Sequence, residues 1–267
     1  MMGGVLTTLM TSLGPTQFKR LRIFNGVMAV FHFVQGLIMV FATNDFTLTI
    51  TTQFQQFDRA TQKLAPFTEN LWDVRIGYLV ATFLFLSALA HLLLVLPGIN
   101  GWYTRNIKRG YNPMRWIEYA FSASVMIVAI GMLVGILDAF ALLLMFGVNA
   151  AMILFGWAME LVNQNREKVE WSTYIFGVIM GILPWVAIAF HLFGAGEGDL
   201  RPPDFVYWIF FTIFVMFNTF AITMVLYFKK VGKFKNYLYA EFTYIVLSLV
   251  AKSLLAWLVF GGTLRPV

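Results

Sequence analysis

The stretch FTYIVLSLVAKSLLAWLVF, residues 242–260, carries one charged side chain, Lys252, in an otherwise apolar run. A helix needs roughly 20 apolar residues to cross about 30 Å of hydrocarbon, which is close to the length of this run. A lysine in the middle of such a helix cannot comfortably extend its side chain to either membrane surface. The stretch therefore predicts a membrane-spanning helix with an amine buried near its centre.

Similar runs occur along the whole chain, which is 60% hydrophobic and 12% charged. An ordinary soluble domain is about a quarter charged, so this composition indicates an integral membrane protein. Between the third and fourth runs only Asp138 intervenes, and the flanking glycines favour a tight turn over one very long helix. We expect residues 1–267 to form a single seven-helix domain in the lipid bilayer, with spans at about 23–42, 76–96, 116–137, 139–159, 171–193, 205–228 and 242–260.

The basic residues are divided unequally between the two faces of the membrane, and such residues mark the cytoplasmic side. One face holds Lys19, Arg20, Arg22, Arg105, Lys108, Arg109, Arg115, Arg166, Lys168, Lys229, Lys230, Lys233 and Lys235. The other face holds Arg59, Lys63, Arg75, Arg201 and Arg265. This predicts a multi-pass protein of the cell membrane with a cytoplasmic N-terminus and an extracellular C-terminus. Because the cations are spread over separate short loops, we do not expect nucleic-acid binding.

The long connection at residues 43–73 falls on the outer face. Its apolar and polar residues alternate, since Phe46, Leu48, Ile50 and Phe54 are separated mainly by threonines and Gln53. A period of two predicts a strand or hairpin. A ribbon with one apolar face needs a cover, which is either its own bundle or a second subunit.

Two charged residues are expected well inside the spans, Lys252 and Glu118. A buried cation must be paired, so Glu118 is the natural counterion of Lys252. Ser122 follows Glu118 by four residues and Ser248 precedes Lys252 by four, which gives each charge a hydroxyl on its own helix face. An alternative is that Glu118 lies near the membrane edge and offsets Arg115, three positions earlier.

The position of Glu118 along its helix depends on where that helix begins. Counted from the basic flanks, Glu118 lies nearer the cytoplasmic boundary than Lys252 does. An early start at Asn112 and Pro113, a plausible cap and first-turn pair, would remove this mismatch.

Burial disfavours the charged form of a lysine and makes its amine nucleophilic toward an aldehyde, so Lys252 is suited to forming a Schiff base. The alternatives are a structural lysine paired within the bundle and the coupling residue of a transporter. His32 and His91 add two titratable groups to the first two spans, where core histidines are the default interpretation. The chain has no cysteine, and its histidines lack metal-ligand spacing, so no metal site is expected.

In combination these segments resemble one family. The seventh-span stretch at 244–253 and the third-span stretch at 115–126 closely resemble heliorhodopsins, which are microbial-type retinal proteins with inverted topology. The stretches 146–157, 181–185 and 217–220 also resemble that family, as do His32 and His91 in their contexts. The resemblance extends from about Phe24 to Thr263. Met224 stands where family members often have a glutamine, a departure that bears on the absorption colour.

The resemblance implies an all-α membrane protein, a rhodopsin-like bundle of seven transmembrane helices with a short β-ribbon in the first extracellular loop. It implies that Lys252 holds all-trans retinal as a protonated Schiff base and that Glu118 is the primary counterion, with Ser122 and Ser248 nearby. His32 and His91 match two histidines of a water-containing cavity that accepts or holds a proton. The implied retinal pocket includes Tyr119, Met126, Met152, Trp185, Phe217 and Asn218.

The function implied by the resemblance is light sensing or signalling, with a slow photocycle, no ion pumping and no enzymatic activity. A homodimer and an unknown cytoplasmic signalling partner are expected on the same grounds. Two alternatives remain open: light-driven proton transport, and a retinal-free transporter that uses Lys252 and Glu118 as a coupled pair.

Overall fold

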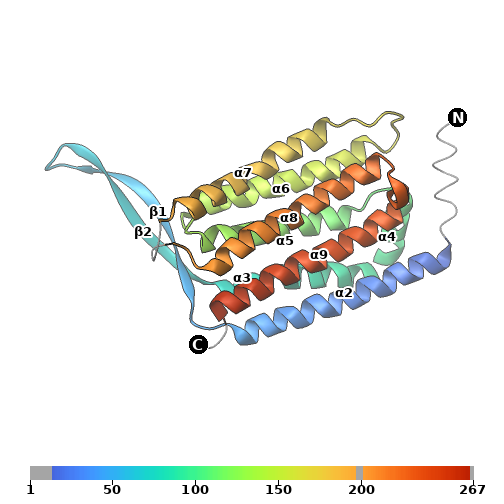
Figure 1. The fold of residues 1–267 in the computed structure, drawn as a ribbon, viewed down its shortest axis with the longest axis horizontal. Coiled ribbons are helices and arrows are strands. Elements are labelled where there is room, and N and C mark those ends of the chain that lie inside the picture. The colour runs from blue at the N-terminus through green and yellow to red at the C-terminus, as the bar shows by residue number, and fades with distance from the viewer. Residues whose placement is uncertain (1–13, 197–200, 265–267) are drawn as a thin grey trace.

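The computed structural model describes residues 14–196 and 201–264. Within them, 7 helices are long and apolar enough to cross a membrane, as predicted. Figure 1 shows these helices running side by side in one bundle. They are α2 (Pro15–Ala42), α3 (Ile76–Val95), α5 (Pro113–Leu133), α6 (Ala139–Val162), α7 (Ser172–Gly194), α8 (Asp204–Phe228) and α9 (Tyr237–Val259).

The first helix begins earlier than expected. α2 starts at Pro15 rather than near residue 23, with the proline in its first turn, where no backbone N–H is needed. Lys19, Arg20 and Arg22 therefore lie on the first turns of the helix and not ahead of it. Arg22 also has a structural contact, because its guanidinium donates two hydrogen bonds, of 2.9 and 2.6 Å, to the carbonyl of Val95 at the end of α3.

The third and fourth spans are separate helices joined by a tight turn, as expected, although α5 ends at Leu133 and not at residue 137. Gly135 has φ +91°, a conformation that glycine adopts without steric cost. The Asp138 side chain then accepts a hydrogen bond from the Ala141 amide and caps α6. At the other end, Asn112 caps α5 and Pro113 is its first residue, so the early start is confirmed.

A short helix absent from the sequence-based expectation, α4 (Ile99–Lys108), lies between α3 and α5. Its Tyr103 and Ile107 pack with Leu21 of α2 and with Tyr237 and Leu238 of α9. Figure 1 shows α4 at the same end of the bundle as the start of α2. Two further short segments are the 3-10 helix η2 (Gly232–Lys235), between α8 and α9, and the π-helical turn η3 (Phe260–Leu264), after α9.

The predicted hairpin is present as an antiparallel ribbon of β1 (Thr47–Asp58) and β2 (Lys63–Arg75). Its base is attached to the bundle, since Ile50 is buried and the Thr51 amide donates a 2.9 Å hydrogen bond to the carbonyl of Leu137. Figure 1 shows the rest of the ribbon projecting from the end of the bundle opposite α4. Several of its large apolar side chains are exposed, namely Phe54, Phe57, Leu64, Phe67 and Trp72.

α3, α5 and α9 contribute many of the buried side chains of the main hydrophobic core. Fully buried apolar side chains such as Phe83, Ile127 and Leu255 fill it. Membrane helices associate through close packing, so these contacts hold the three helices in register. The same three helices carry the buried polar side chains from which the candidate site is built.

Candidate functional site

The buried amine of Lys252 is paired with the carboxylate of Glu118. Lys252 projects from α9 and Glu118 from α5, and the Nζ–Oε1 distance is 3.2 Å. Their side chains are 3% and 7% exposed, so almost no solvent screens this ion pair. Lys252 Nζ also donates a 2.7 Å hydrogen bond to Ser248 Oγ, one turn earlier on α9. The structure thus brings together three of the residues chosen from the sequence.

Glu118 has a further partner on α3. Ser87 Oγ donates a 2.5 Å hydrogen bond to Glu118 Oε1, so α3, α5 and α9 meet at one carboxylate. The Tyr119 ring lies 4.9 Å from Lys252 Nζ, within the range of a cation–π contact. Ser87 was not predicted, because a serine in an apolar helix does not reveal from sequence which side chain it will meet.

The interpretation that Glu118 offsets Arg115 is wrong. Arg115 forms ion pairs with Glu160 of α6 and Glu241 of α9, and its side chain is 3% exposed. Arg115, which was counted among the cations of the predicted cytoplasmic face, is buried near the start of α5. Glu118 is consequently free to pair with Lys252.

Beside the ion pair lies an apolar cavity of about 140 Å³ that reaches from α9 to α7. Lys252 and Ser248 contribute polar atoms, and Trp116, Phe220 and Tyr244 contribute aromatic walls. Met224, identified as a departure from the family pattern, lines it too. Four predicted pocket residues are also in the lining: Tyr119, Met126, Met152 and Phe217.

Three other predicted residues do not line this cavity. Trp185 is buried behind it, with its ring 5.5 Å from that of Phe217. Ser122 is fully buried, and its hydroxyl has no hydrogen-bond partner among the described residues. Asn218 is exposed, and its side-chain amide donates a hydrogen bond to the carbonyl of Phe214.

The lining fits an apolar ligand that ends in an aldehyde. An amine is needed to bond the aldehyde carbon, and Lys252 supplies one at the cavity wall. A carboxylate is needed to balance the resulting positive charge, and Glu118 lies 3.2 Å from that amine. The apolar and aromatic walls suit a conjugated hydrocarbon chain.

The two histidines of α2 and α3 lie together on the other side of the ion pair. Their rings are stacked, with centroids 5.6 Å apart and planes 6° apart. His91 Nδ1 is 2.7 Å from Asn25 Oδ1, whereas neither ring nitrogen of His32 has a hydrogen-bond partner among the described residues. A second cavity, of about 20 Å³, is lined by His91, Asn25 and Glu118, and its volume is about what one water molecule needs.

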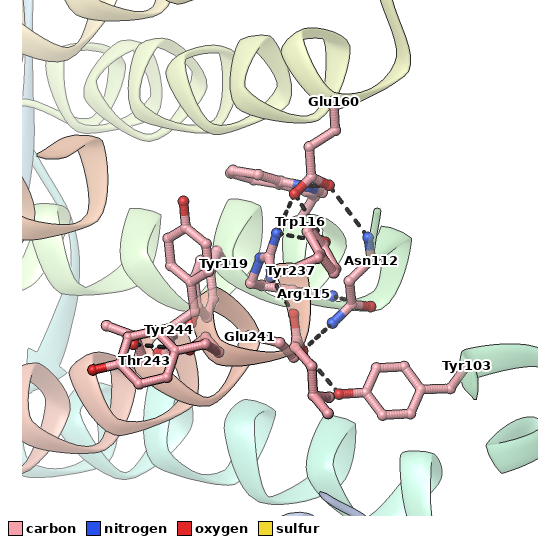
Figure 2. Close-up of polar contacts among 12 residues, drawn as sticks. Tyr103, Asn112, Arg115, Trp116, Tyr119, Glu160, Tyr237, Glu241, Thr243 and Tyr244 are labelled. Carbon is pink, nitrogen blue, oxygen red and sulfur yellow. Dashed lines mark hydrogen bonds and ion pairs between the residues drawn. The ribbon is translucent and has the colours of Figure 1, made fainter. Parts of the chain in front are cut away.

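A second buried charge cluster was not predicted from the sequence, and Figure 2 shows it centred on Arg115. Glu160 accepts hydrogen bonds from the Arg115 guanidinium, the Tyr237 hydroxyl, the Trp116 indole and the backbone N–H of Asn112. Glu241 accepts hydrogen bonds from Arg115, the Tyr103 hydroxyl and the Asn112 side chain. Each of the two carboxylates is thus surrounded by donors and fits its ionised form.

Tyr103 connects this cluster to α4. Burial, and after it the neighbouring Glu241, raise the pKa of the Tyr103 hydroxyl well above its usual value. The hydroxyl therefore keeps its proton and donates a 2.8 Å hydrogen bond to Glu241 Oε1. In the sequence, Glu160 and Glu241 stand directly outside the expected spans 139–159 and 242–260, and nothing in the pattern marks them as buried.

Comparisons with known proteins place the chain in a family. The profile of the heliorhodopsin family matches residues 21–264. No match was found among curated protein sequences. Among solved structures, a light-driven proton pump from Leptosphaeria maculans has a TM-score of 0.61 and 14% sequence identity, over 94% of this chain and 97% of that chain.

The transmembrane domain of the rhodopsin phosphodiesterase from Salpingoeca rosetta is similar as well. With its linker region it gives a TM-score of 0.62 and 13% identity, over 96% of this chain and 77% of that chain. The same domain without the linker gives a TM-score of 0.60 and 12% identity, over 95% of this chain and 91% of that chain. At such identities these similarities show the fold alone, and they agree with the microbial rhodopsin architecture. On the match of its sequence over residues 21–264, this chain belongs to the heliorhodopsin family and is a multi-pass membrane protein of the retinal photoreceptor type.

Proposed function

We propose that this protein is a light sensor in which Lys252 binds all-trans retinal as a protonated Schiff base and Glu118 is the counterion. The observation that carries the proposal is the ion pair of Lys252 and Glu118 beside the apolar cavity. If Lys252 were only structural, the ion pair would be explained, but the position of Lys252 in the wall of an aromatic cavity would not. The family match over residues 21–264 supports the choice of retinal as the aldehyde.

When bound, retinal supplies the absorption of light and the isomerisation that follows. In the dark, Glu118 holds the positive charge on the Lys252 nitrogen, and Ser87 and Ser248 orient the two groups. Tyr119, Met126, Met152 and Phe217 exclude water from the chain of the chromophore, and Trp185 supports Phe217 from behind. Ser122 is proposed as a neighbour of the counterion, whereas the exposed position of Asn218 argues against a contact with retinal.

Light is proposed to separate the charge on Lys252 from Glu118, because an unpaired buried charge is costly and proton transfer relieves that cost. His91 is the proton acceptor in this proposal, since it lines the same small cavity as Glu118. His32 stacks on His91 and shares the displaced proton in this proposal. The proton stays within the protein, so the cycle involves no net pumping.

The orientation proposed is the one with a cytoplasmic N-terminus. Lys19, Arg20, Arg105 and Lys108 lie at the α4 end of the bundle, which supports this assignment. Arg265, counted on the outer face, lies outside the described residues. We further propose that an unknown signalling partner binds the cytoplasmic loops and responds to the light-induced change.

A homodimer is proposed through the ribbon. Phe54, Phe57, Phe67 and Trp72 are exposed on it, and each is a large apolar side chain outside the bundle. A second copy of the chain would cover them. No enzymatic activity is proposed for this protein.

A light-minus-dark spectrum of the purified protein after addition of all-trans retinal tests the sensor proposal. A visible absorption band that bleaches in light and recovers in the dark supports it. A colourless protein would favour the retinal-free transporter instead. In intact cells, a light-driven change in external pH that a protonophore abolishes would replace sensing by proton transport.

A further inference from the structure

We propose that α4 binds anionic phospholipid headgroups of the cytoplasmic leaflet through a basic face made of Trp102, Arg105, Lys108 and Arg109. α4 is amphipathic. Its Tyr103, Asn106 and Ile107 are buried against the bundle, while all four residues of the basic face are exposed. Trp102, Arg105 and Arg109 are spaced by three and four residues and so lie on one side of the helix.

The cations of the basic face have no acidic partners. Among the described residues, neither Arg105, Lys108 nor Arg109 forms an ion pair with a carboxylate. The sequence explains this, because no Asp or Glu occurs between Asp73 and Glu118. Three exposed cations elsewhere are paired, Arg75 with Asp45, Arg166 with Glu170 and Arg201 with Asp204. The exposed lysines of the α8–α9 connection, like the basic face, form no ion pair among the described residues. The basic face thus presents positive charge that nothing described in the chain neutralises.

The location of α4 favours a lipid surface over another anionic partner. α4 is tethered by short turns between two membrane spans, α3 ending at Val95 and α5 beginning at Pro113. It therefore stays at the level of the headgroups. Trp102 is 36% exposed on a helix face that is otherwise basic, and tryptophan is enriched at membrane–water interfaces.

The surface extends toward the start of α2. Lys108 Nζ lies 5.3 Å from the ring centroid of Phe18, and the neighbouring Lys19 is exposed. Clusters of lysine and arginine on an amphipathic helix at the cytoplasmic surface attract anionic lipids. The charges thus serve lipid binding in addition to fixing the orientation of the protein.

Native mass spectrometry of the full chain in detergent, with equal amounts of phosphatidylglycerol and phosphatidylcholine, tests this proposal. The wild type is expected to retain phosphatidylglycerol in preference. In the triple variant Arg105→Gln, Lys108→Gln and Arg109→Gln, the ratio of bound phosphatidylglycerol to bound phosphatidylcholine is expected to fall by roughly ten-fold or more. The reason is that each lysine or arginine near an anionic lipid surface contributes about 1 kcal/mol of attraction. Circular dichroism and gel filtration check that the variant folds, and neither measurement requires retinal.

A matched control removes the same charge from the α8–α9 connection: Lys229→Gln, Lys230→Gln and Lys235→Gln, all exposed. Lys233 is left in place because its Nζ lies 5.9 Å from the Tyr239 ring. The control is expected to keep most of the preference. An equal loss in the control would overturn the assignment to α4, since total charge would then explain the binding.

A wild type without preference for phosphatidylglycerol would overturn the lipid proposal and leave the basic face to an acidic protein partner. If the triple variant fails to fold, Arg105→Gln and Arg109→Gln are tested singly with the same readout. Each is expected to lower the preference several-fold. No reduction in either single variant would contradict the proposal.

Discussion

Glu241 and Lys252 lie on the same side of α9, about three turns apart, and each forms an ion pair with a residue of opposite charge on α5. The polarity is reversed between the two pairs. Glu241 binds the cation Arg115, and Lys252 binds the anion Glu118. Between them, the small cavity is lined by Glu118, Arg115 and Glu241, so both pairs border the same space.

This arrangement links the proposed retinal site to the α4 end of the bundle. A change at the Lys252–Glu118 pair alters the charge bordering the small cavity. Arg115 and Glu241 border the same cavity, and Tyr103 of α4 is bonded to Glu241. The small cavity and the Arg115 cluster thus lie between the proposed retinal site and α4, where we propose that the signal reaches the partner.

Replacing Glu118 by Gln is expected to change both the absorption maximum and the pH at which the colour is lost. Without the carboxylate, the protonated nitrogen on Lys252 has no charge partner, so its proton is released at lower pH. The midpoint of the colour titration should fall by roughly 1 to 3 pH units, the effect of one close opposite charge. Glu69→Gln, on the exposed ribbon, is the control, and an unchanged titration in Glu118→Gln would rule out the counterion role.

Replacing Arg115 by Met is expected to destabilise the bundle by about 3–5 kcal/mol, because two buried carboxylates would be left without their cation. The measurement is the free energy of unfolding in SDS titrations followed by circular dichroism. Arg59→Met, at the tip of the ribbon, should change it by less than about 0.5 kcal/mol. A similar small change for Arg115→Met would show that Glu160 and Glu241 are not held by this arginine.

Replacing Tyr103 by Phe should destabilise the protein by about 1.5–3 kcal/mol, since a hydrogen bond to a buried carboxylate is lost. Tyr239→Phe is the matched control, because Tyr239 is 40% exposed. Thermal melting of the two variants in the same detergent gives the comparison. Equal melting temperatures would mean that the bond to Glu241 does not hold α4 in place.

Gly156→Ala on α6 is expected to cost about 1–3 kcal/mol through overpacking. A Cβ at this position would stand 2.5 Å from the ring of Trp116, which lines the cavity and donates to Glu160. Gly147→Ala on the same helix is the control, because a Cβ there meets nothing within 4 Å. It should be neutral or stabilising by up to about 1 kcal/mol. The prediction fails if the two variants are equally stable in SDS titrations.

The spans, the ribbon and the meeting of Lys252 with Glu118 could be anticipated from the sequence because each has a one-dimensional signal. Long apolar runs predict spans, and alternation over residues 46–54 predicts the ribbon. A charge deep in an apolar run needs a partner, and Glu118 was the acidic residue available. The Asn112–Pro113 pair marked the start of α5 correctly.

The remaining features depended on tertiary contacts. Glu160 and Glu241 stand at the ends of apolar runs, where a charge normally reaches water, but tertiary contacts bury both of them. Glu160 bonds to residues of α5 and α9, and Glu241 bonds to residues of α5 and α4. Ser87 could not be assigned because its partner is on another helix. Asn218 was selected through family resemblance, which does not determine the direction in which a side chain points on its helix.

The most direct test of the account is to reduce the retinal-reconstituted protein with borohydride and to locate the adduct by peptide mass spectrometry. A retinyl group is expected on the peptide that contains Lys252, and it should be absent from Lys252→Ala protein treated in the same way. An unmodified Lys252 peptide in coloured protein, or an adduct on any other lysine, would contradict the assignment of Lys252 as the attachment site.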